Sequence, residues 1–248
     1  MREYIKNVVL HYQSNYKRCL LAISNQEKVP NYSCDHQYVT IVDDHYPTCF
    51  FKLRYPPLCL FYQGDLSLLS KRCVGVIGAR KNSEYSAKMT RHIVKQLAKT
   101  HCIVSGFAQG IDSIAHQASI KTVAFLGCGL NIDYPKSNKP LRQTIKECGC
   151  LISEYGDNVL PKRHHFPWRN RLIACASPHL LVMQASYHSG TMHTAKAAME
   201  LGHQVYCLPS LYDDLQTQGC HELINDGAMV LTKELVLDII KESVGGEK

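Results

Sequence analysis

The chain has 248 residues, and its 28 lysines and arginines outnumber its 21 aspartates and glutamates, which gives a formal net charge of +7. A hydrophobic content of 45% allows a substantial core, in one large domain or in one domain with a small appendage. No run of about 20 apolar residues is present, and the first residues, MREYIKNVVLHYQ, are too polar for a signal peptide, so we expect a cytoplasmic protein with no membrane contact.

The first 37 residues predict a helical N-terminal appendage. Residues 1–24 have a pattern that suits one or two amphipathic helices. Two β-rich runs follow, YVTIV at 38–42 and LCLFY at 58–62, and both suit strands that extend one edge of a sheet. Up to residue 70 the chain lacks the regular alternation of strands and helices that comes after it.

From Cys73 onward, short β-rich runs alternate with segments of helical periodicity. Strands are predicted at 73–78, 102–106, 122–127, 151–154, 179–184, 204–208 and 228–231. Helices are predicted after Ser83, over 111–120, near 140–148, from a start within 169–176, over 190–201 and near 220–225. Six or seven strands separated by helices predict an α/β fold with a parallel, doubly wound sheet.

The turns that follow the predicted strands are rich in small, hydroxylated or basic residues. Ligands of a doubly wound sheet bind outside the carboxyl ends of its strands, where helix N-termini favour anions. Each turn also has a structural interpretation, because glycines are common in such turns and hydroxyls often cap helices. Their repetition predicts one phosphate-binding rim, made of Arg80 and Lys81 after the first core strand, Ser105 and Gly106 after the second, and Ser189, Gly190 and Thr191 after the fifth.

The most basic stretch is PKRHHFPWRNRLIACAS at 161–177, whose first eleven positions hold four lysines and arginines, two histidines, two aromatic residues and no acid. The cations can neutralise phosphates, and Phe166 or Trp168 offers a face on which a base can stack. This combination is typical of proteins that bind single-stranded nucleic acid. A solvated basic loop is the alternative interpretation. The cations are Lys162, Arg163, Arg169 and Arg171.

Other chemistry finds less support in the sequence. GCGLNI at 127–132 lacks the third glycine of a dinucleotide fingerprint, and there is no Walker A motif. Asp112 and His116 share one helical face, which suits a metal pair or proton relay, but equally a cap and a packing contact. The 12 cysteines are scattered without a C-x-x-C pair, which indicates reduced thiols. We expect no metal, no cofactor and no catalytic activity.

Seven motifs follow one another along the chain: IGARKNSEYS, SGFAQGIDSIAH, AFLGCGLNIDYP, LISEY, FPWRNRLIACAS, SGTMHTAKAAMELG and GCHELINDGA. With DDHYPTCFFKLRYPPLCLFYQGD upstream, this order resembles the DprA/Smf DNA-processing family over residues 38–231. The resemblance implies an extended Rossmann-like domain that binds single-stranded DNA at the strand ends, usually as a homodimer. It also implies that the bound DNA passes to the RecA recombinase during natural transformation.

The resemblance implies roles for particular residues. It implies a domain over 38–248 after the appendage at 1–37, and we expect no C-terminal winged helix. The family's arginine in the GLARGID pattern is Gln109 here, and its serine before the first-turn arginine is Ala79, so we expect weaker or more salt-sensitive binding. The implied DNA-binding set is Arg80, Ser105, Gly106 and Arg163 for phosphate, Phe166 for base stacking, and Arg169, Asn170, Arg171, Ser189, Gly190 and Thr191; Lys81 joins it from the rim.

Two alternatives remain. One is an enzyme of related architecture that resembles the nucleotide phosphoribohydrolases, whose motif is P-G-G-x-G-T-x-x-E. The corresponding window here, YHSGTMHT, lacks the double glycine and has Thr194 at the position of the glutamate. The other is a nucleotide- or nucleic-acid-sensing module that has no connection with transformation.

Overall fold

The computed structural model describes residues 1–242, and these residues form nine strands and nine α-helices. The strands are β1 (Gln37–Thr40), β2 (Cys59–Gly64), β3 (Cys73–Ile77), β4 (Cys102–Ser105), β5 (Thr122–Leu126), β6 (Cys150–Ser153), β7 (His179–Val182), β8 (Gln204–Cys207) and β9 (Met229–Val230). The helices are α1 (Arg2–His11), α2 (Tyr16–Ser24), α3 (Glu84–Leu97), α4 (Ile111–Gln117), α5 (Lys139–Cys148), α6 (His165–Cys175), α7 (Gly190–Glu200), α8 (Gln218–Asn225) and α9 (Lys233–Glu242). The end of the predicted domain, 243–248, lies outside the described residues.

All nine strands join one sheet in the order β1-β2-β6-β5-β4-β3-β7-β8-β9. Strands β3 to β9 run parallel, and β2 and β1 extend the β6 edge as an antiparallel pair. The chain winds outward from β3 to β6 and then continues from β7 on the other side of β3. This order confirms the predicted α/β fold with a doubly wound, mostly parallel sheet, and it puts the topological switch point between β3 and β7.

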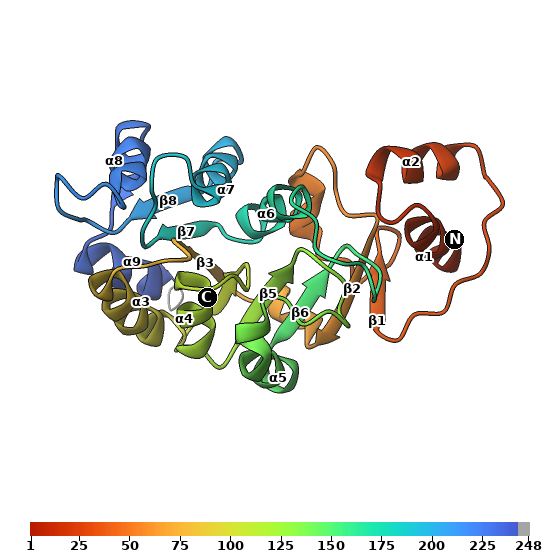
Figure 1. The fold of residues 1–248 in the computed structure, drawn as a ribbon, viewed down its shortest axis with the longest axis horizontal. Helices are drawn as coiled ribbons and strands as arrows, with labels where there is room; N and C mark the ends of the chain where they lie inside the picture. The colour runs from red at the N-terminus through yellow and green to blue at the C-terminus, as the bar shows by residue number, and fades with distance from the viewer. Residues whose placement is uncertain (243–248) are drawn as a thin grey trace.

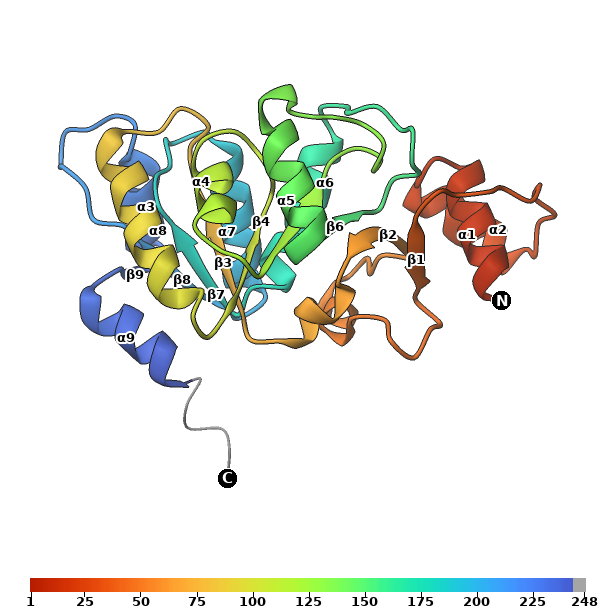
Figure 2. The ribbon, with the colours of Figure 1, turned by 90° about the horizontal axis from the view of Figure 1, so that it is seen from below.

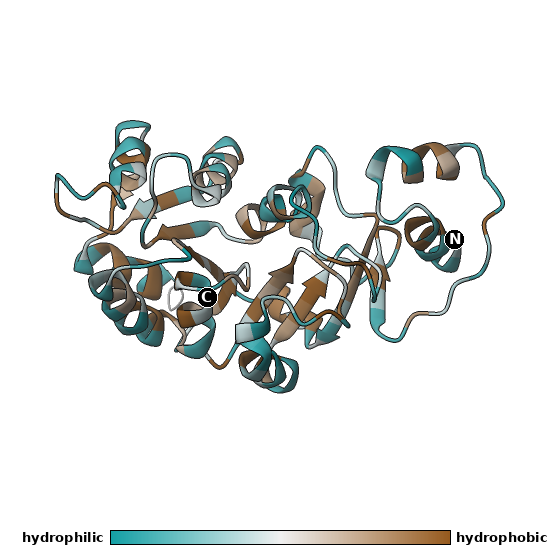
Figure 3. Ribbon diagram, in the orientation of Figure 1, coloured by the Kyte–Doolittle hydropathy of each residue, from teal (hydrophilic) through white to brown (hydrophobic). Residues whose placement is uncertain are grey.

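Helices cover both faces of the parallel part of the sheet. Figure 1 shows α6, α7 and α8 on one side of it and α3, α4 and α5 on the other. Alternate side chains of a strand face opposite layers, so Val74 and Val76 pack with α3 and α4 in one core cluster while Cys73 and Ile77 pack in another. The strands of this part of the sheet are accordingly largely hydrophobic (Figure 3).

The appendage consists of α1 and α2, which lie beside β1 at one end of the molecule, while α9 lies at the other end (Figure 2). Both helices agree with the predicted helical character of residues 1–24. Val8 and Val9 of α1 are buried in one cluster with Phe61 of β2 and Leu126 of β5. The appendage therefore packs onto the sheet through apolar contacts.

Two helix boundaries and one whole helix differ from the prediction. The expected start within 169–176 is wrong, because α6 begins at His165. Pro167 lies in the first turn of α6, where backbone N–H groups have no partner within the helix and a proline is tolerated. In addition, α4 ends at Gln117, and α9 was not expected although it buries Val236 and Ile239. None of the helices in residues 1–242 has the length and apolar composition of a membrane span.

Candidate nucleic-acid interface

A cavity of about 670 Å³ opens at the switch point, beyond the carboxyl ends of β3 and β7. We call it the sheet-edge cavity. Its walls come from the turn after β3, from the first turns of α6 and from the start of α7. The residues of the predicted DNA-binding set that line it are Arg80, Lys81, Arg163, Phe166, Arg169, Asn170, Ser189, Gly190 and Thr191. The structure therefore brings together nine residues from a turn, a loop and two helix starts that are distant in the sequence.

A hollow of about 370 Å³ adjoins this cavity and shares Arg80, Phe166 and Arg169 with it. Gly106 and Gln109 line the hollow. Sequence reasoning did not select Tyr134 or Lys136, which also belong to its lining. Tyr134 belongs to the NIDYP segment after β5, and Lys136 follows that segment directly, so both could have been found from another turn at the carboxyl edge of the sheet.

Three cations at the sheet-edge cavity are available to a ligand. Arg80, Lys81 and Arg163 are exposed, and within the described residues none of them forms an ion pair. Asp112 is the acidic residue of the lining, and it is buried below the rim. The mouth of the cavity is therefore positively charged.

The half-buried ring of Phe166 lines the same cavity as these cations. The guanidinium carbon of Arg80 is 5.7 Å from the ring centroid, and the ring of Tyr134 is 5.6 Å away. Gly127 leaves room for the ring, since a Cβ atom there would lie 2.9 Å from Cδ1 of Phe166. A planar base and a phosphate can thus meet an aromatic ring and a guanidinium at one place.

Arg169 also lines the cavity, but its side chain is 5% exposed and is held by protein groups. Its guanidinium donates hydrogen bonds to the carbonyl oxygens of Gly106 and Phe125. Burial lowers the pKa of Arg169 to about 10, and the nearby carboxylate of Asp112 opposes that shift. Burial likewise raises the pKa of Asp112, against the effect of Arg169. Arg169 therefore braces the ends of β4 and β5.

Gly106 is required by this bracing contact. A Cβ atom at Gly106 would lie 2.8 Å from Oδ2 of Asp112 and 2.9 Å from Nη1 of Arg169. Gly106 was predicted to lie close to a phosphate. In the structure it instead lies close to the buried side chain of Arg169.

Two predicted residues point elsewhere. Ser105 is fully buried, and its hydroxyl donates a 2.6 Å hydrogen bond to the carbonyl oxygen of Val76. Arg171 does not line the sheet-edge cavity; its two terminal nitrogens donate to the carboxylate of Glu154 at 2.6 and 2.7 Å. The Arg171 guanidinium also packs over the ring of Trp168, 4.1 Å from its centroid.

The start of α7 completes the wall. Ser189 precedes the helix, and its hydroxyl oxygen is buried without a hydrogen-bond partner among the described residues. Asn170 donates a 3.4 Å hydrogen bond to the carbonyl oxygen of Gly190. The N–H groups of the first turn of α7 face outward from the helix end and favour an anion.

The residues considered for catalysis have other partners. His116 bonds to the hydroxyl of Thr122 at 2.7 Å, and Asp112 accepts from the backbone N–H of Ala108 at 3.2 Å. Thr194 is buried, and its hydroxyl donates to the carbonyl oxygen of Gly190 at 3.3 Å. The 12 cysteines are free thiols, and residues 1–242 contain no cluster of three or more metal-ligating side chains.

Comparison with known proteins identifies the family. Its sequence model, DNA recombination-mediator protein A, matches residues 37–242. DNA processing protein DprA of Streptococcus pneumoniae is 39% identical over 210 residues, which cover 83% of this chain and 72% of that protein. Protein Smf of Synechocystis is 38% identical over 207 residues, 80% of this chain and 52% of that protein. The chain thus spans about half the length of the Synechocystis relative.

Two solved structures agree with this result. The structure of DprA from Streptococcus pneumoniae matches with a TM-score of 0.79 at 32% identity, over 96% of this chain and 92% of that one. DprA from Helicobacter pylori, described for its single-stranded DNA binding mode, matches with a TM-score of 0.78 at 32% identity, over 84% of this chain and 98% of that one. The chain is thus similar in sequence to DprA and Smf proteins and in fold to two DprA structures, and it belongs to the DNA recombination-mediator protein A family.

Proposed function

We propose that the protein binds single-stranded DNA at the sheet-edge cavity and loads the RecA recombinase onto it during natural transformation. The observation that carries the proposal is the group of three exposed, unpaired cations within the described residues, Arg80, Lys81 and Arg163, around the half-buried ring of Phe166. The Helicobacter pylori relative is itself described as binding single-stranded DNA.

Different residues of the sheet-edge cavity bind the phosphates and the bases of the DNA. Arg80, Lys81 and Arg163 neutralise phosphates, and the amides at the start of α7 accept a further one. A base stacks against Phe166, which is recessed in the cavity and is accessible to a base that is not paired in a duplex. Binding is therefore selective for single-stranded DNA over duplex DNA.

The remaining predicted residues position this surface. Arg169, with Gly106, holds the ends of β4 and β5 together, and Ser105 ties β4 to β3. We assign Arg171 to its ion pair with Glu154, because its guanidinium is occupied there. Asn170, Ser189, Gly190 and Thr191 form the wall on the α7 side.

The later steps rest on membership of the family. A homodimer would present two sheet-edge cavities to one DNA strand, and the strand would then pass to RecA. Binding of DNA by this chain and transfer to RecA are separate steps, so they need separate measurements.

The first test is fluorescence anisotropy with labelled single-stranded and duplex DNA of equal length across a salt series. Preference for the single strand and a steep dependence of affinity on salt are expected. Equal affinity for duplex, or turnover of a nucleoside monophosphate without DNA binding, would contradict the proposal. The rate of RecA filament formation on the same strand, with and without the protein, tests the second step.

A further inference from the structure

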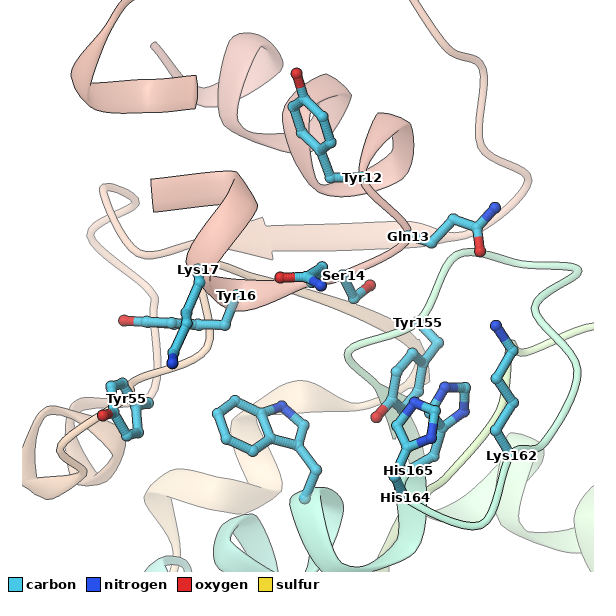
Figure 4. Close-up of a pocket in the computed structure, with 12 residues that line it drawn as sticks. Tyr12, Gln13, Ser14, Tyr16, Lys17, Tyr55, Tyr155, Lys162, His164 and His165 are labelled. Atoms are coloured by element: carbon cyan, nitrogen blue, oxygen red, sulfur yellow. The ribbon is translucent and has the colours of Figure 1, made fainter. Parts of the chain in front are cut away.

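A second cavity, of about 480 Å³, lies on the other side of the start of α6. We call it the N-terminal cavity. It is lined by residues 12–17, which form the connection between α1 and α2 and the start of α2, and by Tyr55, Tyr155, Lys162, His164, His165 and Trp168. Figure 4 shows Tyr16 and Lys17 on one side of it and Lys162 with the two histidines on the other. The appendage therefore forms one wall of a built cavity.

Aromatic rings make the floor of the N-terminal cavity. Tyr16, Tyr55 and Trp168 lie together, with ring centroids 5.3 to 6.0 Å apart. The packing of Arg171 on Trp168, together with the ion pair to Glu154, holds the half-buried indole in place. Rings fixed in this way provide a surface on which a base can stack.

The charge of the lining is positive. Lys17 and Lys162 are exposed, and neither forms an ion pair within the described residues. The lining includes no aspartate or glutamate. Glu154 lies close by, since its backbone oxygen accepts a hydrogen bond from Ser14, but its carboxylate is occupied by Arg171. The cavity therefore suits an anion that carries an aromatic ring, as a nucleotide does.

The two cavities are separated by the first turns of α6. Lys162 lines the N-terminal cavity, and its neighbour Arg163 lines the sheet-edge cavity. Phe166 and Trp168 are two residues apart on the helix, which places them on different sides of it, one in each cavity. A strand that crosses the start of α6 can thus reach an aromatic ring on each side.

His165 lies between the two sites and contacts both. It lines the N-terminal cavity, where its ring stacks on Tyr155 at 3.9 Å. Its Nδ1 is 3.1 Å from the carbonyl oxygen of Gly127, which lines the hollow beside the sheet-edge cavity. Packed protein groups thus hold the two cavities at a fixed spacing.

We propose that the N-terminal cavity is a second nucleotide subsite for single-stranded DNA. A DNA strand bound at the sheet-edge cavity crosses the start of α6 and stacks a further base on the rings of Tyr16, Tyr55 and Trp168. Lys17 and Lys162 bind the phosphates of that part of the strand. This inference rests on the proposed function, and it extends the DNA site to the appendage. Strands too short to span both cavities occupy the sheet-edge cavity alone.

Trp168 is the one tryptophan of the chain, so its fluorescence reports on the N-terminal cavity. The experiment titrates the full chain with oligothymidines of increasing length and follows both anisotropy of the labelled DNA and Trp168 emission. Short strands are expected to bind without quenching, and longer ones to bind more tightly with quenching. Binding at every length without quenching would overturn the second subsite and leave the proposed function standing, whereas no binding at any length would overturn both.

A pair of variants tests the phosphate contacts. Replacing Lys17 and Lys162 together by alanine is expected to lower the log K against log salt slope for long strands by about 1.4, at about 0.7 for each lost contact. Affinity for short strands stays unchanged. Lys28→Ala is the matched control, because Lys28 is exposed on the same appendage and lines neither cavity. An unchanged slope in the double variant, or equal losses for short and long strands, would overturn the subsite.

Discussion

The guanidinium of Arg80 lies over the ring of Phe166, with 5.7 Å between Cζ and the ring centroid. Arg80 comes from the turn after β3 and Phe166 from the first turn of α6, so the pair spans the switch point of the sheet. A base that stacks on this ring places its phosphate near the guanidinium. The pair thus joins the apolar and the ionic parts of the proposed DNA site.

Replacing Phe166 by alanine removes the stacking surface and leaves the cations. We expect the affinity for single-stranded DNA to fall by about 1–3 kcal/mol, with little change in its salt dependence. Anisotropy across a salt series measures both quantities, and Phe166→Tyr, which keeps the ring, serves as the control. Wild-type affinity in the alanine variant would exclude Phe166 from the site.

Arg163 is an exposed cation of the sheet-edge cavity. It is exposed and has no ion-pair partner in residues 1–242, so Arg163→Ala should leave the stability unchanged. Binding should weaken equally for all DNA sequences, and the slope of log K against log salt should fall by about 0.7. Lys99→Ala removes an exposed cation between α3 and β4, away from the carboxyl edge, and should have no effect. A slope that stays unchanged in Arg163→Ala would reject the phosphate contact.

Gln109, where the resemblance to the family implies an arginine, lines the hollow beside the sheet-edge cavity. Its amide donates a 3.0 Å hydrogen bond to the hydroxyl of Ser137, and the side chain is exposed. Gln109→Arg should tighten binding and raise the salt slope by about 0.7, because it adds one cation to the rim. Gln109→Met, which loses the hydrogen bond without adding charge, is the control. Equal affinities of the two variants would place Gln109 outside the path of the DNA.

Arg171 and Glu154 form a largely buried pair, with 13% and 7% of their side chains exposed. Arg171→Ala leaves the carboxylate without its partner and should lower the free energy of unfolding by about 3 kcal/mol. Urea unfolding measures this loss, and the double variant Glu154→Gln, Arg171→Met should recover part of it. A fall in the DNA salt slope at unchanged stability would instead return Arg171 to the DNA site.

His116 makes the stability depend on pH. Its Nδ1–H donates to the hydroxyl of Thr122, whose own hydrogen goes to Ile103, so buried Nε2 is unprotonated. Burial lowers the pKa of His116 from 6.5 to about 3, and the unfolded chain therefore takes up this proton first as the pH falls. The stability is complete above pH 6.5 and declines below it, by about 1.4 kcal/mol per pH unit for this proton.

Urea unfolding between about pH 6 and pH 5 tests the effect of this histidine. His116→Gln should reduce the pH slope by about one proton relative to the natural chain. Buried His101 and His165 and half-buried His203 have pKa values that burial also lowers, so they contribute the remaining pH dependence of the stability. A variant slope equal to that of the natural chain would show that His116 does not titrate on unfolding.

Local pattern was sufficient for most of the architecture. Strand β3 and helix α3 follow directly from the run CVGVI and from the apolar spacing after Ser83, whose hydroxyl caps the helix by accepting from the N–H of Ser86. The start of α6 was missed because Pro167 signals a helix break, although in a first turn it breaks no hydrogen bond. The motifs likewise predicted which turns would meet at the sheet edge.

The sequence by itself determined the doubly wound sheet, the family and the basic turns at the carboxyl edge, because periodicity and motif order are local properties. The availability of each cation was decided by the tertiary structure. Arg163, Arg169 and Arg171 lie in one basic segment, but their surroundings differ. Arg163 is exposed. Arg169 is buried and donates to the carbonyl oxygens at the ends of β4 and β5, and Arg171 forms an ion pair with Glu154. Their partners lie far away in the sequence, and only folding brings those groups within hydrogen-bonding distance.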